Sequence, residues 1–292
     1  MNFVAVDVET ANSDMASICQ IGLAIYENGT LASEWNSLVD PEDYFDGINV
    51  SIHGIDVAAD SGAPKLPEIA ELVCKHMSGR VVVCHTHFDR VAIRQAFLKH
   101  SLSVPDCTWL DTALVARRTW QEFSWSGYGL KNVCDKLGYK FAHHDALGDA
   151  KASAHVLLAA ICKTGIDLNG WLKRVGLPIS LSNSSGKGAF RDGNPEGPLY
   201  GEVLVFTGAL GILRREAAEL AAKIGCTVAD GVNKKTTLLV VGDQDVRQLE
   251  GMEKSSKHRK AEELILKGQA IRIIMESDFK ELVILAVEST KD

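Results

Sequence analysis

The sequence predicts an α/β protein in two parts: a mixed sheet flanked by helices, followed by a small parallel-sheet α/β domain. Along the 292 residues, short apolar runs rich in β-branched side chains alternate with segments of helical spacing. Residues 175–197 interrupt this pattern with a polar stretch rich in Gly, Pro, Ser and Asn, after which the pattern restarts. We therefore expect a first domain over residues 1–170, a flexible linker over residues 171–198 and a second domain over residues 199–292.

The first domain is expected to open as an antiparallel meander of three strands. Asn28-Gly29 between the second and third runs favours a tight hairpin turn. Residues 49–55 are expected to form a loop, and Asp145 is expected to cap a long Ala-rich helix. The expected strands are 3–8, 17–26, 31–39, 80–84 and 104–111, and the expected helices are 67–77, 90–100, 113–120, 129–138 and 145–162.

The second domain repeats the alternation of strands and helices on a smaller scale. Strands are expected at 203–206, 238–241 and 271–274, and helices at 214–224, 256–268 and 278–287. Each strand is followed by a helix, which is typical of a parallel sheet.

Composition limits the class of protein. The longest apolar runs fall short of the roughly 18 residues that span a bilayer, so we expect no membrane partner. The chain enters a strand at once, which predicts no secretory signal, and its seven scattered cysteines indicate reduced thiols in a cytoplasmic protein. The net charge of −7 argues against a globally basic nucleic-acid binder but leaves room for metal-bridged phosphate binding.

Two carboxylates stand at the end of the first expected strand. Asp7 and Glu9 are two residues apart, so their side chains project to the same side of that strand. They repel each other unless a cation lies between them, and oxygen ligands favour hard metals such as Mg²⁺ or Mn²⁺. The alternative is that one carboxylate caps a turn and the other is solvated.

Two further acids lie near the ends of other expected strands and helices. Asp89 comes after a strand, and Asp149 lies in the first turn of a helix, five residues after His144. Ligand sites in α/β sheets collect at such ends, and four carboxylates could hold two cations about 4 Å apart. This arrangement suits in-line displacement at a phosphodiester, and a histidine with a pKa near 6.5 could take the proton from the attacking water.

These residues also form a pattern. Asp7-Val8-Glu9-Thr10, Phe88-Asp89 and His144-x-Ala146-x-x-Asp149 resemble, in order and spacing, the three motifs of the DEDDh (DnaQ-like) 3′–5′ exonucleases, which include the epsilon subunit of bacterial DNA polymerase III. Residues 52–55 and 109–112 are similar to secondary signatures of that family. The resemblance covers about the first 165 residues.

The resemblance implies a ribonuclease H-like fold and removal of nucleotides from DNA 3′ ends. It implies that two Mg²⁺ or Mn²⁺ ions are held by Asp7, Glu9, Asp89 and Asp149, with His144 as general base. Substrate contacts would come from Thr10, His53, His85 and Phe88. One departure is that His85 stands where the family usually has Asn, which leaves the substrate preference open.

Several polar and aromatic residues near these motifs could have a structural role instead of a functional one. His143 is expected to be a neighbour without chemistry, and His53 is more typical of a loop anchor. Asp111 is expected to cap a helix. His85 and His87 are expected to satisfy local hydrogen bonds, and Trp120, Trp125 and Tyr128 are candidates either for base stacking or for a loop or core role.

The second domain carries its own resemblance. Residues 199–210, 215–217, 234–242 and 256–261 resemble BRCT domains, in particular the single copies in NAD-dependent ligases and replication factor C large subunits. Gly225-Cys226 stands where the family has Gly-Gly, and Phe279 where its last helix has Trp.

A phosphate site is expected where the first strand of this domain ends. Thr207 and Gly208 offer a hydroxyl and backbone N–H groups, and the resemblance adds Lys257. The ligand would be 5′-phosphorylated DNA or a phosphorylated replication or repair protein. The alternative is a domain that mediates protein contacts only.

Together these observations predict a metal-dependent 3′–5′ exonuclease of the proofreading or repair type, acting on DNA and localised by its BRCT domain. Two alternatives stay open. One is a 3′–5′ exoribonuclease of the same superfamily, and the other is a BRCT-driven adaptor with a vestigial nuclease domain.

Overall fold

The computed structural model describes residues 1–177, 179, 193–243 and 254–288, and these fall into two compact units. Residues 1–45 and 52–177 form the first unit, whereas residues 46–51 group with the second. Of the expected linker, residues 178 and 180–192 lie outside the described residues. Helix α7 (Leu168–Arg174) crosses the expected boundary at 170, and the division at 170 and 198 stays a prediction.

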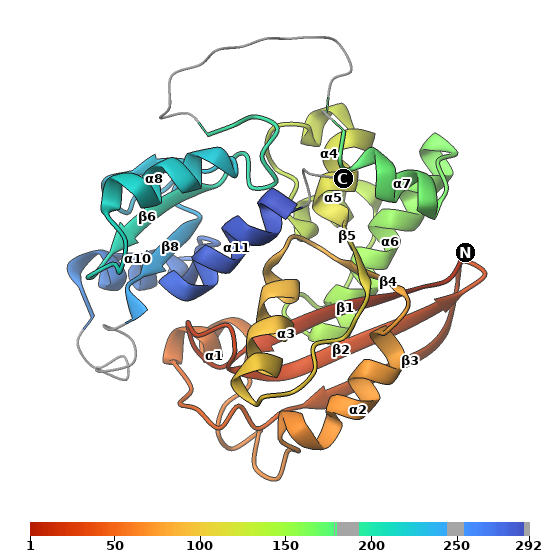
Figure 1. Cartoon of the computed structure of the whole chain (residues 1–292), viewed down its shortest axis with the longest axis horizontal. Coiled ribbons are helices and arrows are strands. Elements are labelled where there is room, and N and C mark those ends of the chain that lie inside the picture. Colours follow the sequence, from red (N-terminus) through yellow and green to blue (C-terminus); the bar gives the residue numbers. More distant parts are fainter. Residues whose placement is uncertain (178, 180–192, 244–253, 289–292) are drawn as a thin grey trace. The chain divides into compact units, whose positions relative to one another are not determined.

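A five-stranded mixed sheet forms the centre of the first unit, in the order β3-β2-β1-β4-β5 (Figure 1). The antiparallel meander is confirmed, with Asn28 and Gly29 both at positive φ in the turn between its last two strands. The two later strands run parallel to the first. The strands are β1 (Phe3–Thr10), β2 (Ile18–Glu27), β3 (Thr30–Leu38), β4 (Val81–Cys84) and β5 (Thr108–Asp111).

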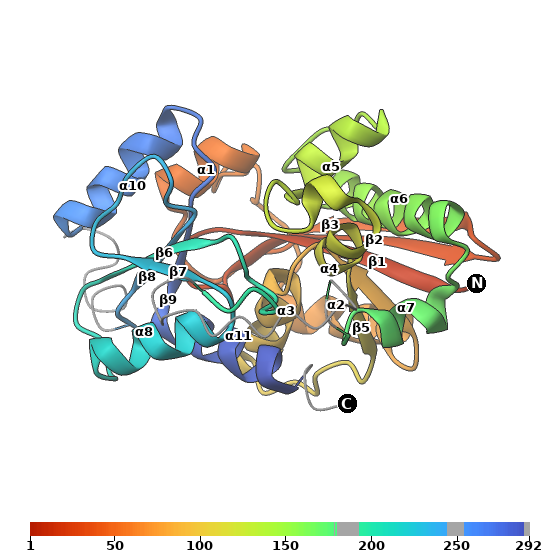
Figure 2. The same ribbon diagram turned by 90° about the horizontal axis from the view of Figure 1, so that it is seen from above.

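Helices cover both faces of this sheet, with α6 on one face and α3 on the other (Figure 2). Phe3 and Ala5 of β1 belong to the core beneath α4, α5 and α6, and Val4 and Val6 are fully buried on the opposite face. The helices are α2 (Leu66–Met77), α3 (Phe88–Lys99), α4 (Thr112–Thr119), α5 (Leu130–Leu137), α6 (Ala146–Thr164) and α7, with a 3₁₀ turn at Gln121–Phe123.

The first turn of α6 lies directly against β2. A Cβ atom on Gly22 would come within 2.3 Å of the Leu147 backbone nitrogen, so only glycine permits this approach. Gln20 lies two residues before Gly22, on the same face of β2. Its Oε1 accepts a hydrogen bond of 3.0 Å from the Ala146 backbone N–H. Asp145 caps the helix as expected, its side chain accepting from the Gly148 N–H at 3.0 Å.

The second unit is built on a four-stranded parallel sheet, in the order β7-β6-β8-β9. Its core includes Phe279, which is fully buried and meets Phe206 edge-on with ring centroids 5.3 Å apart. An aromatic anchor is therefore kept at the position expected from the sequence. The elements are β6 (Val203–Thr207), α8 (Arg214–Lys223), β7 (Thr227–Ala229), β8 (Leu238–Val241), α10 (Ser256–Leu266), β9 (Arg272–Met275) and α11 (Glu276–Glu288).

The expected loop over residues 49–55 is wrong, because the chain forms helix α1 (Gly47–His53) there. Asp46 begins this helix by accepting from the Ile48 N–H at 3.0 Å, and Ile48 is buried. Strand β7 and helix α7 were not expected either. With three and seven residues respectively, they are too short to show a clear hydrophobic period.

Within the described residues, no helix combines the length and apolar character needed to cross a bilayer. The seven cysteines all lie in this part of the chain and are free thiols.

Gly22→Ala should destabilise the first unit by about 1–3 kcal/mol, because the added methyl group meets helix backbone that cannot rotate away. All five tryptophans precede residue 178, so their fluorescence during chemical denaturation reports on this unit. Gly176→Ala is the control, since its added carbon would come no closer than 3.6 Å to the atoms around it. Equal stability of the two variants would contradict the tight approach of α6 to β2.

Candidate active site

Three carboxylates from two elements converge at one end of the first sheet. Asp7 and Glu9 project from β1 on the face that α6 covers, and Asp149 lies in the first turn of α6. One oxygen from each carboxylate lies within 4.8 Å of the others. Asp149 is buried, whereas Asp7 and Glu9 are half-buried.

The chemistry of this donor set fits a hard divalent cation. Three ionised carboxylates this close repel one another strongly in a partly buried site, and a cation removes that cost. All three donors are oxygen atoms, which Mg²⁺ and Mn²⁺ prefer. Asp7, Glu9 and Asp149 are therefore the residues that would hold such an ion.

Asp89, the fourth expected ligand, lies next to this group. It is buried in the first turn of α3, and its Oδ1 accepts a hydrogen bond of 3.2 Å from the Val8 N–H. Val8 stands between Asp7 and Glu9 on β1, so the contact joins the start of α3 to the strand that carries both acids. Among the described residues, the group of three carboxylates within 4.8 Å does not include Asp89.

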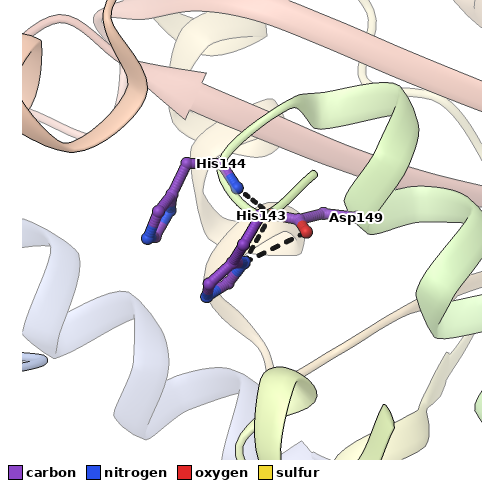
Figure 3. Close-up of side chains that lie close together, drawn as sticks. All are labelled: His143, His144 and Asp149. Atoms are coloured by element: carbon purple, nitrogen blue, oxygen red, sulfur yellow. Dashed lines mark hydrogen bonds and ion pairs between the residues drawn. The ribbon is translucent and has the colours of Figure 1, made fainter. Parts of the chain in front are cut away.

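His144 lies in the turn before α6, in the left-handed region at φ 66°. A non-glycine residue in this conformation costs about 1–2 kcal/mol, and such strain is common at functional sites. Its backbone N–H donates to Asp149 Oδ2 at 3.0 Å (Figure 3), and its Nδ1 is 3.9 Å from Glu9 Oε1. The expected base therefore lies beside two of the three clustered acids.

His143, for which the sequence indicates no chemistry, contacts Asp149 directly. Its Nδ1 lies 3.1 Å from Oδ1 and 3.2 Å from Oδ2 of that carboxylate (Figure 3). Its ring stacks on that of His144, with centroids 3.9 Å apart and planes 20° apart. The sequence signal for this contact is the adjacent His-His pair just before the helix that carries Asp149.

Two of the residues expected to contact the substrate, His53 and Phe88, lie in different surroundings. His53 Nε2 lies 3.2 Å from the Thr10 carbonyl, and its Nδ1 accepts from the Ile55 N–H at 3.0 Å, so the ring anchors the loop at the end of β1. Phe88 is buried at the start of α3. Burial lowers the pKa of His53 because the charged imidazolium loses its hydration.

His85 is buried, and both of its ring nitrogens are engaged within the protein. Nδ1 lies 2.8 Å from the Thr112 hydroxyl and Nε2 lies 2.7 Å from the Tyr128 carbonyl. Burial lowers its pKa, which favours the neutral imidazole. The expectation of local hydrogen bonds is confirmed for His85, whose part in substrate binding stays a prediction. It is not confirmed for His87, whose buried Nε2 has no hydrogen-bond partner within the part of the chain that the structure describes and lies 4.0 Å from Asp111 Oδ2.

Asp111 supports the segment that leads to Asp89. Its Oδ1 accepts from the N–H groups of Ala113 at 2.8 Å and Thr86 at 2.9 Å, so its expected role as a helix cap is confirmed. Of the aromatic candidates, Trp120 and Tyr128 are buried in the core, while Trp125 is exposed. The first two are therefore core residues.

In the second unit, the three expected phosphate-site residues meet at the end of β6. The Thr207 hydroxyl is buried and lies 2.6 Å from the Ser255 hydroxyl, and Lys257 Nζ donates to the Phe206 carbonyl at 3.1 Å. Gly208 adopts φ 75° and accepts from Arg214 at 2.6 Å. A lysine and a hydroxyl thus lie close together beside a glycine turn.

Comparison with known proteins gives two family matches. The exonuclease family model (RNase_T) matches residues 4–157, more than half of the chain. The BRCA1 C Terminus (BRCT) domain model matches residues 194–280.

Among curated proteins, the chain is 27% identical over 165 residues to a DNA polymerase III PolC-type protein of Caldanaerobacter subterraneus, covering 55% of this chain and 12% of that protein. It is 43% identical over 70 residues to a DNA ligase of Gluconobacter oxydans, covering 24% of this chain and 9% of the ligase. The chain thus spans about an eighth or less of the length of these relatives.

Among solved structures, exonuclease I matches with a TM-score of 0.50 at 15% identity, covering 56% of this chain and 41% of exonuclease I. This likeness confirms the expected ribonuclease H-like fold. The matched families bear out both resemblances seen in the sequence: the chain belongs to the DnaQ-like exonuclease family and carries a BRCT domain after its exonuclease domain.

Proposed function

We propose that the protein is a metal-dependent 3′–5′ exonuclease that releases nucleotides from DNA 3′ ends. The observation that carries this proposal is the convergence of Asp7, Glu9 and Asp149, whose oxygens lie within 4.8 Å of one another. Membership of the exonuclease family supports the reaction class, and the matches to a DNA polymerase and a DNA ligase support DNA as the substrate.

In this proposal, the side chains of the site hold the metal, accept a proton or contact the substrate. Asp7, Glu9 and Asp149, with Asp89 beside them, hold Mg²⁺ or Mn²⁺, which when bound would polarise the scissile phosphate and lower the pKa of water. His144 has 40% of its side chain exposed, so its imidazole can reach a water at the site and accept the proton. Asp89 also holds α3 against β1 through the Val8 N–H, and we propose Thr10 and Phe88 as contacts to the 3′-terminal nucleotide.

DNA and RNA are distinguished by direct digestion. Matched 3′-labelled DNA and RNA, single- and double-stranded, should be digested with Mg²⁺ and with Mn²⁺. Faster release from DNA supports the proposal, and faster release from RNA would move the protein to the exoribonucleases. No release from any strand would leave a BRCT-driven adaptor as the better reading.

We infer that the BRCT domain brings the nuclease to phosphorylated ligands, with Thr207, Gly208 and Lys257 as the contacts. The grouping of a cation, a hydroxyl and a glycine turn supports a phosphate ligand. The seven free thiols support a cytoplasmic location, and a replication or repair role of the proofreading type is the setting we propose.

Asp7→Asn and Asp149→Asn should each reduce nucleotide release to background while the circular dichroism spectrum stays native. Each change removes a negative charge from a shared cation site without changing the side-chain volume. Mn²⁺ binding, followed by electron paramagnetic resonance, should weaken in parallel. Asp135→Asn is the control, because Asp135 is an exposed residue of α5 paired with Lys131. Turnover near wild type in either site variant would overturn the carboxylate assignment.

His144→Asn should lower turnover by roughly 10²–10⁴-fold while Mn²⁺ affinity stays nearly unchanged, as expected for loss of a general base. Asparagine is chosen because it tolerates the left-handed backbone of this position better than alanine does. His76→Asn on α2 controls for loss of a histidine elsewhere. A large loss of Mn²⁺ affinity in the site variant would instead make His144 a metal ligand.

Lys257→Glu in the full chain should abolish any preference for 5′-phosphorylated over 5′-hydroxyl duplex DNA, because a like charge would face the phosphate. Lys260→Glu is the matched control, on the same helix but paired with Glu263 at the surface. Binding should weaken as salt rises, since phosphate contacts release counterions. Equal binding of the two duplexes by the wild type, with selective capture of a phosphopeptide, would favour a protein ligand.

A further inference from the structure

We propose that His143, His144 and Asp149 form a second metal site, which binds a transition-metal cation of the zinc class and blocks the nuclease when filled. This site is distinct from the group of Asp7, Glu9 and Asp149 because two of its three donors are imidazole nitrogens. The two sites have Asp149 in common.

The geometry of the three side chains supports a shared ligand. One donor atom from each residue lies within 4.8 Å of the others, and His143 Nδ1 is already within 3.2 Å of both Asp149 oxygens. The two rings lie side by side and the carboxylate lies next to them (Figure 3).

The local backbone explains why neighbouring histidines can act together. In an extended chain, consecutive side chains point to opposite sides. The left-handed conformation at His144 turns the chain sharply, and the two rings stack with planes 20° apart. Asp149 is held in the first turn of α6, so the third donor is fixed by the helix.

The site is open to an ion from solution. The side chains of His143 and His144 are 34% and 40% exposed, while that of Asp149 is only 5% exposed. A hydrated cation can therefore reach the imidazoles first and exchange water for the buried carboxylate. Three protein ligands and one water would complete four-coordination.

The donor chemistry selects the ion. Imidazole nitrogen suits Zn²⁺, Co²⁺, Ni²⁺ and Cu²⁺, whereas Mg²⁺ takes oxygen donors and keeps its waters. The three-carboxylate group has the opposite preference. Two overlapping sites thus sort the cations by type, with hard ions among the carboxylates and borderline ions at the histidines.

Filling the second site would remove two groups that the proposed reaction needs. Asp149 would be withdrawn from the carboxylate group, and His144 could no longer accept a proton. This consequence rests on the proposed function, whereas the existence of the site does not. The expected result is inhibition by Zn²⁺ that excess Mg²⁺ or Mn²⁺ relieves through competition for Asp149.

The direct test uses the full chain freed of metal by chelation. X-ray absorption of the protein loaded with one equivalent of Zn²⁺ should show two imidazole ligands together with oxygen ligands. Co²⁺ in place of Zn²⁺ should give the visible absorption of a tetrahedral site. A shell of oxygen alone, or an octahedral Co²⁺ spectrum, would overturn the proposal without any need for a variant.

A variant series then assigns the residues. His143→Gln should weaken Zn²⁺ binding at least about tenfold, because loss of a group that merely orients a ligand already costs about 10–100-fold. His155→Gln is the matched control, since His155 is half-buried on α6 and stacks on Tyr139 instead. Equal Zn²⁺ affinity in wild type and His143→Gln would contradict the assignment. The binding arms need no substrate, so their failure is distinguishable from failure of the proposed nuclease activity.

Discussion

The close approach of α6 to β2 is the constraint on which the candidate site depends. Gly22 leaves room for the Ala146–Leu147 backbone, and Gln20 holds the Ala146 N–H. In the sheet register, Gly22 is opposite Asp7 and Gln20 is opposite Glu9. The two β2 residues that contact the start of α6 are therefore cross-strand neighbours of the two β1 acids that face this helix. This pairing brings Asp149, on the first turn of the helix, to the acids of β1.

The same helix start also determines the electrostatics of the site. The partial positive charge at its N-terminus stabilises negative charge, and the His144 N–H donates to Asp149. Asp145 accepts the hydrogen bond from the Gly148 N–H, and Asp149 contacts the two histidines. One buried and two half-buried acids therefore lie beside a helix N-terminus and two half-exposed imidazoles. In this arrangement, cations of different chemistry can compete for Asp149.

Much of this arrangement could be predicted from the sequence because it follows from local periodicity. The meander, the Asn28-Gly29 turn, the caps at Asp111 and Asp145 and the side shared by Asp7 and Glu9 all depend on residues near one another in the chain. The convergence of Asp149 on β1 was expected from motif spacing and family resemblance, since no local pattern indicates that contact.

Other features depend on contacts between distant residues and could not be read from local patterns. The role of Gly22 requires knowing that α6 packs above it, and the contact of His143 with Asp149 requires the left-handed turn at His144. Helix α1 was missed for a different reason: it has only seven residues and no long apolar period, although its cap at Asp46 is local.

The most direct test of the central claim is the direction and chelator sensitivity of digestion. The full chain should be incubated with 5′-labelled single-stranded DNA and the products resolved at single-nucleotide resolution. With Mg²⁺ or Mn²⁺ present, we expect a ladder that shortens one nucleotide at a time from the 3′ end and that stops on chelation. Internal fragments, release of the 5′ label as a mononucleotide at the earliest times, or digestion that persists in chelator would contradict it.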